Sequence, residues 1–284
     1  MRRKTTAVRI GNVVLSSEEP VLVQSMLNTS TREVDACVEQ AIRIIEAGGR
    51  LVRITAPGVK EAEMLGEIHR RLRERGYTTP ISADIHFVAE AASVAARYVE
   101  KVRINPGNFA DKRATFKKLT YTDEEYAAEL EILRQKFTEF LEVCRQYGTA
   151  VRIGTNHGSL SDRIMSRYGD TPAGMVEATM EYLRVCQACD FKDVVISLKS
   201  SDCRTMVDAV RLLVEKMEAE GMCYPLHLGV TEAGEGEDGR IRSAVGIGTL
   251  LNEGIGDTIR VSLTEEPEAE IPVACELARI CSEP

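Results

Sequence analysis

Residues 101–108 read KVRINPGN, and residues 150–158 read AVRIGTNHG. Successive side chains of a strand point to opposite faces, so each stretch has one apolar face and one face that carries Arg103 or Arg152. Strands that pack an apolar face under helices and turn a polar face inward are typical of a parallel barrel near its ligand-binding end. Each stretch therefore predicts a barrel strand that brings an arginine to an internal site.

Six more segments of this kind recur about every 25 to 45 residues, which is the spacing expected of βα units. They span 20–26, 51–57, 80–87, 194–200, 225–234 and 258–264. Amphipathic segments with helical periodicity lie between them. Eight strands alternating with eight helices predict an α/β fold, a (β/α)8 TIM barrel, that fills residues 1–284 as a single domain. An open doubly wound sheet is the alternative, but its strands should be hydrophobic on both faces.

Helix ends and two irregular segments complete this organisation. Residues 30–33 (STRE) and 122–125 (TDEE) each fit a capping box at a helix start. Residues 1–19 are expected to form a lead-in hairpin that closes the bottom of the barrel. The connection over 109–121 is long and basic, and it is either a solvated surface or a supplementary anion contact. Its cations are Lys112, Arg113, Lys117 and Lys118.

The composition excludes several classes of protein. The net charge of −8 and the absence of Trp disfavour a nucleic-acid partner, which needs an extended basic surface or stacking aromatics. No apolar stretch reaches the roughly 20 residues that span a bilayer, and the N-terminus has no apolar signal core. Eight scattered cysteines without a signal peptide indicate reduced thiols, and we expect a cytoplasmic bacterial protein. The sequence leaves a homodimer open.

Five cations are expected at strand ends, where they would converge on one cavity. They are Arg53, Arg103, Arg152, Lys199 and Arg260. Arginine presents a fixed fork of donors that matches phosphate oxygens, so the set suits a phosphorylated ligand. Each cation could instead pair with a barrel carboxylate such as Asp84, Glu232 or Asp257. Five cations exceed these acids, however, and uncompensated charge in a confined space is costly.

Further polar residues follow the same strands. Asp84 and His86 share one face, at the right spacing for an acid that orients an imidazole. His227 ends another strand, and Glu232 is the best candidate for a general acid. A His/His/Asp metal site is conceivable, but the surrounding cations would repel a divalent ion, so we expect no metal ligands. Cys186 and Cys189 form an incomplete metal-binding pattern and are interpreted as structural.

Several segments together resemble the barrel domain of the 4-hydroxy-3-methylbut-2-enyl diphosphate synthase family, in its extended plant-type form. They are VRINPGN (102–108), VRIGTNHGSL (151–160), SLKSSD (197–202), HLGVTEAG (227–234) and GIGDTIRVSLT (254–264). The resemblance implies a reductase that opens the ring of 2-C-methyl-D-erythritol 2,4-cyclodiphosphate with loss of water, in non-mevalonate isoprenoid biosynthesis. It implies ferredoxin or flavodoxin as the electron donor.

The resemblance also assigns roles to residues. The residues implied to hold the diphosphate are Arg53, Arg103, Asn105, Arg152, Asn156, Lys199, Arg260 and Ser262. Asp84, His86 and His227 would shape the site, and Glu232 would be the acid near the departing hydroxyl. The family carries a [4Fe–4S] cluster in a separate C-terminal domain, whose cysteine pattern does not occur here. The chain is therefore expected to be the barrel alone, with no cofactor of its own and no turnover by itself.

Two alternatives remain open at this point. A barrel similar to dihydropteroate synthase would share the fold and an anion site, but it would need a pterin-recognising set of Asp, Asn and Lys. An isolated barrel could also act only as a phosphate-binding module, without catalysis.

Overall fold

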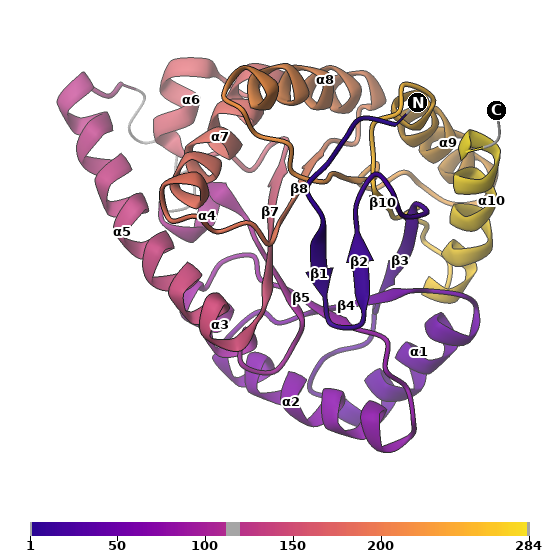
Figure 1. The fold of residues 1–284 in the computed structure, drawn as a ribbon. Coiled ribbons are helices and arrows are strands. Elements are labelled where there is room, and N and C mark those ends of the chain that lie inside the picture. Colours follow the sequence, from indigo (N-terminus) through magenta and orange to yellow (C-terminus); the bar gives the residue numbers. More distant parts are fainter. Residues whose placement is uncertain (1, 112–119, 283–284) are drawn as a thin grey trace.

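Eight parallel strands form a barrel at the centre of the computed structural model, which describes residues 2–111 and 120–282 (Figure 1). The strand order is β8-β7-β6-β5-β4-β3-β10-β9, and a parallel bridge between Ile196 of β8 and Leu226 beside β9 joins its two ends. The strands are β3 (Leu22–Met26), β4 (Leu51–Thr55), β5 (Ile81–Asp84), β6 (Lys101–Ile104), β7 (Ala150–Asn156), β8 (Val194–Lys199), β9 (His227–Leu228) and β10 (Thr258–Ile259). The TIM-barrel prediction is confirmed.

Helices surround the strands as an outer ring (Figure 1). The α-helices are α1 (Val34–Glu46), α2 (Val59–Glu74), α3 (Ala89–Ala95), α4 (Pro106–Phe109), α5 (Asp123–Tyr147), α6 (Asp162–Tyr168), α7 (Pro172–Ala188), α8 (Cys203–Ala219), α9 (Gly236–Asn252) and α10 (Glu270–Ser282). A 3-10 turn, η1 (Pro267–Ala269), precedes α10. In the described residues, α4 and α6 are short additions to the regular alternation of strand and helix.

The main hydrophobic core lies between the strands and this ring of helices. Val102 and Ile104 of β6 and Val151 and Ile153 of β7 are fully buried there, on the strand face opposite Arg103 and Arg152. Burying each apolar side chain contributes about 1.5–3 kcal/mol. The apolar alternate residues therefore fix which face of each strand meets the helices, and they turn the polar residues into the barrel.

An antiparallel hairpin formed by β1 (Val8–Ile10) and β2 (Val13–Leu15) lies across one end of the barrel. Its apolar side chains share a second hydrophobic cluster with residues near the starts of four barrel strands. The members of this cluster are Val8, Ile10, Val13, Leu15, Leu22, Leu51, Ala150 and Val195. Strands begin at this end, so the hairpin covers the bottom of the barrel and leaves the carboxyl ends of the strands at the other mouth.

Some boundaries differ from the sequence-based expectations. The seventh and eighth barrel strands, expected over 225–234 and 258–264, pair over only two residues each, because the chain leaves the ladder while its polar alternation continues. The capping box at Thr122 forms, whereas that at Ser30 does not, since α1 begins three residues later without a side-chain cap. The four cations of the 109–121 connection lie outside the described residues.

Candidate active site

The carboxyl ends of the strands surround a cavity of about 150 Å³. Nine of the expected site residues line it: Arg53, Asp84, His86, Arg103, Arg152, Asn156, Lys199, Arg260 and Ser262. Met26, Ser197, Val230 and Thr231 complete the lining. Arg53, Asp84, Arg103 and Arg152 are almost completely buried, whereas Lys199 and Arg260 are partly exposed. The cavity thus has a buried ionic floor and a more accessible rim that carries basic side chains.

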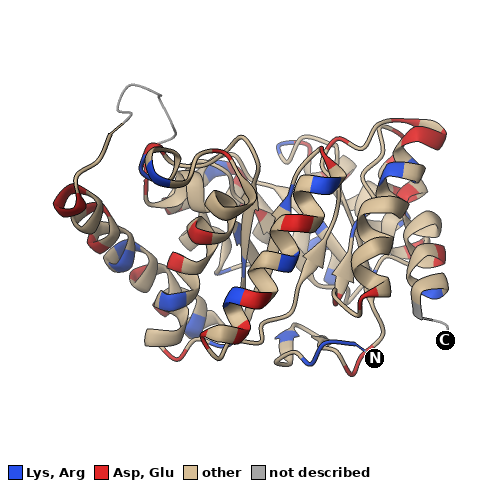
Figure 2. Cartoon of the chain, turned by 90° about the horizontal axis from the view of Figure 1, so that it is seen from above, with Lys and Arg blue, Asp and Glu red and all other residues tan. Residues whose placement is uncertain are grey.

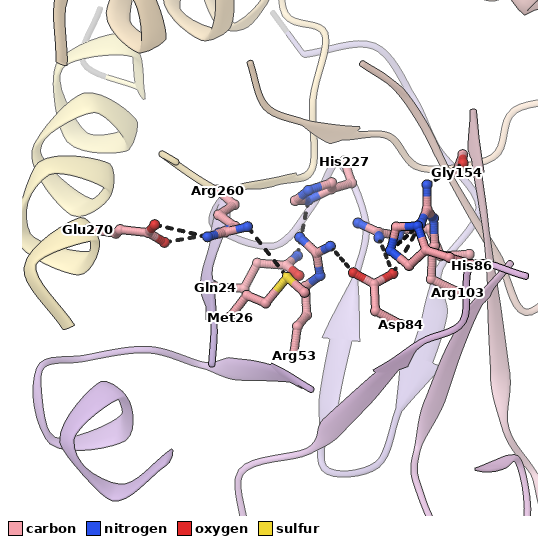
Figure 3. Close-up of polar contacts among 11 residues, drawn as sticks. Gln24, Met26, Arg53, Asp84, His86, Arg103, Gly154, His227, Arg260 and Glu270 are labelled. Atoms are coloured by element: carbon pink, nitrogen blue, oxygen red, sulfur yellow. Dashed lines mark hydrogen bonds and ion pairs between the residues drawn. The ribbon is translucent and has the colours of Figure 1, made fainter. Parts of the chain in front are cut away.

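Asp84 at the end of β5 is the centre of the floor (Figure 3). Its carboxylate accepts a hydrogen bond from Arg53, accepts one from Arg152 at 3.2 Å, and lies 3.5 Å from Nη1 of Arg103. Burial by itself would raise the pKa of Asp84, but the three guanidinium groups outweigh it and hold this pKa well below its usual value. Asp84 is therefore ionised at neutral pH, one negative charge shared by three positive ones.

The three floor arginines have more donors than this carboxylate can accept. Five of their nitrogen atoms are buried and have no hydrogen-bond partner among the described residues: Nε and Nη1 of Arg53, Nε of Arg103, and Nε and Nη1 of Arg152. Burial and the neighbouring Arg53 lower the pKa of Arg152 well below its usual value. A buried guanidinium without sufficient counter-charge is unfavourable, so this floor is arranged to gain from an added anion.

Arg260 is neutralised differently, by a residue that the sequence analysis missed. Its guanidinium donates to both carboxylate oxygens of Glu270, each at 2.9 Å (Figure 3). Glu270 is the first residue of α10, is 1% exposed, and also accepts from Ser25 Oγ at 2.6 Å. This bidentate pair fixes the orientation of Arg260 at the rim. No local sequence pattern connects a glutamate at a helix start to an arginine ten residues earlier.

His86 contacts Arg103 rather than Asp84. Nη1 of Arg103 lies 3.0 Å from Nε2 of His86 and 3.5 Å from Asp84. The guanidinium of Arg103 therefore stands between the acid and the imidazole. Burial and the charge of Arg103 lower the pKa of His86 to about 4. His86 is therefore neutral at physiological pH, and its ring accepts a hydrogen bond from Arg103. The expectation that Asp84 orients His86 directly is wrong.

Two glycines make room for the cationic side chains. A Cβ on Gly154 of β7 would lie 2.5 Å from Nε of Arg103, whose Nη2 donates to the Gly154 carbonyl at 2.7 Å. A Cβ on Gly229 would lie 2.9 Å from Nζ of Lys199. Each cation therefore occupies space that a side chain at the glycine position would fill. The sequence analysis did not assign a role to either glycine.

Three expected site residues do not line the cavity. Asn105 caps α4, accepting from the Gly107 amide, and donates to Ser159 Oγ at 3.0 Å. His227 is 1% exposed inside the barrel, where its Nδ1 lies 3.1 Å from Nε2 of Gln24. Glu232 is exposed on the loop after β9, with a left-handed backbone (φ 52°).

A fully buried lysine that the sequence analysis missed lies inside the barrel. Lys101 begins β6, two residues before Arg103, and its Nζ has no hydrogen-bond partner among the described residues. Burial and the charges of Arg152 and Arg53 hold the pKa of Lys101 well below its usual value. The same parity argument that found Arg103 could have found Lys101, which shares its strand face.

The described residues contain no group of three or more His, Cys, Asp or Glu side chains placed to hold a metal ion. None of the eight cysteines lines the cavity, and Cys37, Cys144 and Cys186 are buried. Burial raises the pKa of Cys186 well above its usual value, so its thiol stays protonated. His157, the residue that follows β7, is exposed and contacts Asp170.

The outer helices of the described residues carry charges of both signs. Lysines and arginines alternate with aspartates and glutamates along the outer helices (Figure 2). Arg184 of α7, for example, pairs with Glu177 at 2.6 Å and with Glu220 at 2.8 Å. None of the helices in the described ranges is long and apolar enough to cross a bilayer. In the part of the chain that the structure describes, arginines that outnumber their carboxylate partners line the barrel mouth.

A family model described as the GcpE TIM-barrel domain matches residues 5–275. The chain belongs to this family. As a GcpE barrel, it is 64% identical over 276 residues to 4-hydroxy-3-methylbut-2-en-1-yl diphosphate synthase (flavodoxin) of Parabacteroides distasonis, covering 97% of this chain and 45% of that protein. It is 52% identical over 280 residues to the chloroplastic ferredoxin enzyme of Arabidopsis thaliana, covering 99% of this chain and 38% of that protein. This GcpE barrel thus spans less than half the length of these relatives.

Among solved structures, this GcpE barrel is similar to dihydropteroate synthase of Yersinia pestis in complex with a sulfonamide drug. The TM-score is 0.62 at 12% sequence identity, covering 98% of this chain and 99% of that chain. At this identity the likeness shows the fold alone.

Proposed function

We propose that this barrel binds a small organic diphosphate, 2-C-methyl-D-erythritol 2,4-cyclodiphosphate, and presents it for reduction to 4-hydroxy-3-methylbut-2-enyl diphosphate. The observation that carries the proposal is the charge of the cavity, where four arginines face the two carboxylates of Asp84 and Glu270. The activity named for the two relatives supports the product class and the kind of reaction. In this proposal the barrel supplies the substrate site of an oxidoreductase of isoprenoid biosynthesis.

The floor and the rim would have different tasks. Arg53, Arg103 and Arg152 are held in place by Asp84 and carry more positive charge than it neutralises, so this preorganised floor would attract a phosphate group. Arg260 is more exposed and would close on the second phosphate from the rim, and Lys199 lies at the same rim as a further hydrogen-bond donor. Asn156 and Ser262 line the same cavity and offer neutral hydrogen bonds beside the charged ones.

Proton transfer is proposed for Glu232, near the hydroxyl that leaves as water. A carboxylic acid adds nothing to anion binding, so its place on a loop at the cationic mouth is better explained by proton delivery. His86 is neutral and directed to Arg103, so it supports the floor without donating a proton. His227 is sealed inside the barrel and touches Gln24, which argues against direct contact with substrate.

A [4Fe–4S] cluster is part of the proposed reaction, but the described residues of this chain do not fit it. Such clusters are held by several cysteine thiolates, whereas no cysteine lines this cavity and Cys186 is held as a thiol by burial. We therefore assign the cluster to a part of the enzyme outside this barrel and derive no step through it. Flavodoxin and ferredoxin, after which the two related enzymes are named, are the proposed electron donors.

Calorimetry with the cyclic diphosphate and this chain tests the proposal. Wild-type barrel should bind with an affinity that falls as salt rises, because recognition is mainly charge on charge. Arg103→Ala and Arg152→Ala should each weaken binding by about 1.5–3 kcal/mol, the range for hydrogen bonds to charged groups. Arg184→Ala, which removes an arginine of the outer surface, is the matched control and should bind normally. Unchanged binding in both cavity variants would remove the proposed function.

A further inference from the structure

We propose that Lys199 is a reactive amine that forms an imine with small aldehydes carrying a phosphate group. The inference rests on the proposed anion site, because that site would hold the phosphate while the aldehyde meets the lysine. It adds a covalent binding mode, and with it a class of ligand, that reductive ring opening does not require.

The position of Lys199 sets it apart from an ordinary surface lysine. It is the last residue of β8, it lines the cavity with four arginines, and its aliphatic chain runs over Gly229. No salt bridge to a carboxylate is found for it among the described residues, whereas Arg260 beside it has Glu270. Its side chain is partly exposed and lines the cavity, so a small molecule bound there would lie beside it.

The surroundings favour the neutral amine, which is the nucleophilic form. Burial and the positive charges of Arg53, Arg152 and Arg260 hold the pKa of Lys199 well below its usual value. A desolvated lysine beside other cations is a recognised form of activated amine nucleophile. The same arginines that lower this pKa would bind the phosphate of the incoming aldehyde.

The reaction balances without any other reagent. The Lys199 nitrogen attacks the aldehyde carbon, and a carbon–nitrogen single bond forms. Both amine hydrogens then leave with the former carbonyl oxygen as one water molecule, and a carbon–nitrogen double bond remains. No oxidant or reductant takes part, so the step needs only the aldehyde and the cavity.

Two other lysines of the chain are internal controls. Lys101 is also buried near Arg53 and Arg152 and its pKa is also lowered, but it is fully buried and does not line the cavity. Lys192 is exposed, pairs with Asp190 at 3.1 Å, and precedes β8 at the opposite end of the strand from Lys199. Lys192 is thus accessible but lies outside the cationic cavity, whereas Lys101 has a lowered pKa but is not accessible.

The experiment treats this chain with glycolaldehyde phosphate or with glycolaldehyde, traps imines with cyanoborohydride, and maps the modified lysines by peptide mass spectrometry. Lys199 should be labelled at least about tenfold faster by the phosphorylated aldehyde, since the cationic cavity concentrates it. Inorganic pyrophosphate should suppress this labelling. Lys192 should react equally slowly with both aldehydes, and Lys101 should stay unmodified.

The outcomes separate this inference from the proposed function. Calorimetric binding of pyrophosphate together with an unlabelled Lys199 would overturn the imine inference and leave the diphosphate site standing. Labelling of Lys199 at the rate of Lys192, without preference for the phosphorylated aldehyde, would overturn it as well. Absence of pyrophosphate binding would remove the proposed function, and the phosphate preference at Lys199 would be lost with it.

Discussion

Arg152 on β7 reaches past β6 to Asp84 on β5, with 3.2 Å between its Nη2 and the carboxylate Oδ1. The contact crosses the barrel interior, where neither residue is more than 1% exposed. Arg53 of β4 meets the same carboxylate from the opposite side, so one acid ties three strands together at the floor of the site. The stability of the barrel and the proposed ligand site therefore depend on the same residue.

Removing the negative charge of Asp84 should destabilise the fold. Asp84→Asn leaves three buried guanidinium groups without their shared partner, and breaking a buried ion pair from one side costs about 3–5 kcal/mol. Denaturant unfolding should show this loss, and added pyrophosphate should recover part of it by replacing the lost charge. Asp208→Asn is the control, because Asp208 is exposed and lies 3.8 Å from Arg204 and Arg211. An Asp84→Asn protein as stable as the control would contradict this account.

Wild type and Asp84→Asn should also differ in how their free energy of unfolding depends on pH. The folded pKa of Asp84 is depressed, so the ionised carboxylate stabilises the fold above the unfolded pKa of about 3.9. That stability is lost as the pH falls through the lower, folded value. The difference in unfolding free energy between wild type and Asp84→Asn should stay constant from about pH 7 to pH 5 and shrink below about pH 4. A difference that shrinks already near neutral pH would mean that Asp84 is not the origin.

Gly154→Ala should displace Arg103. The new methyl group would meet Nε of Arg103 at 2.5 Å and Oγ of Ser197 at 3.2 Å, and such overpacking costs about 1–3 kcal/mol. Calorimetry should show weaker diphosphate binding, since Arg103 would no longer be directed into the floor. Gly248→Ala on α9 is the control, because its methyl group would find ordinary contacts, the nearest at 3.6 Å from Leu277. Helix propensity favours that change by about 1 kcal/mol, so a loss of stability or binding there would weaken the comparison.

Glu232→Gln should separate binding from chemistry. The change keeps the shape of the side chain and removes the acid, so affinity of the barrel for the cyclic diphosphate should be unchanged or improved. Turnover of the full-length enzyme should fall by about 10²–10⁴, the usual contribution of a positioned proton donor. Glu237→Gln, on an exposed residue of α9, is the matched control. Near-normal turnover of the Glu232→Gln enzyme under a strong reductant would assign the proton to another donor.

Cys186 in α7 and Cys189 just after it should not bind an iron–sulfur cluster. Anaerobic treatment of this chain with iron and sulfide should leave no stoichiometric iron, because Cys186 is buried and held as a thiol. Stoichiometric iron that disappears in Cys186→Ser and Cys189→Ser would show that these residues are ligands after all.

Strand periodicity predicted the fold and most of the cavity because it depends on local geometry alone. Arg53, Arg103 and Arg152 each stand between two apolar residues of a strand, so they share the face opposite the core. The structure places all three in the cavity. Periodicity gives the face of a strand but not the depth along the barrel axis. His227 points into the barrel, as its strand face predicts. It is the first residue of β9, however, and therefore lies below the cavity.

Other residues needed local or tertiary information that the pattern of alternation does not contain. Asn105 precedes Pro106, a combination typical of a helix start, and it caps α4 instead of facing the cavity. Its role could have been found from sequence. Glu270 could not, because its pairing with Arg260 depends on how α10 returns across the mouth of the barrel.

The β1–β2 hairpin covers the bottom of the barrel with apolar side chains, so ligands approach the interior from the mouth. An anion, a water molecule or a proton that approaches Lys101 from the open mouth meets Arg53, Arg103 and Arg152 first. Their field attracts anions and repels cations, as rings of like charge do at the entrance of an ion-selective pore. The hairpin and the arginines thus leave one approach to Lys101, and the positive charge along it favours anions over metal cations.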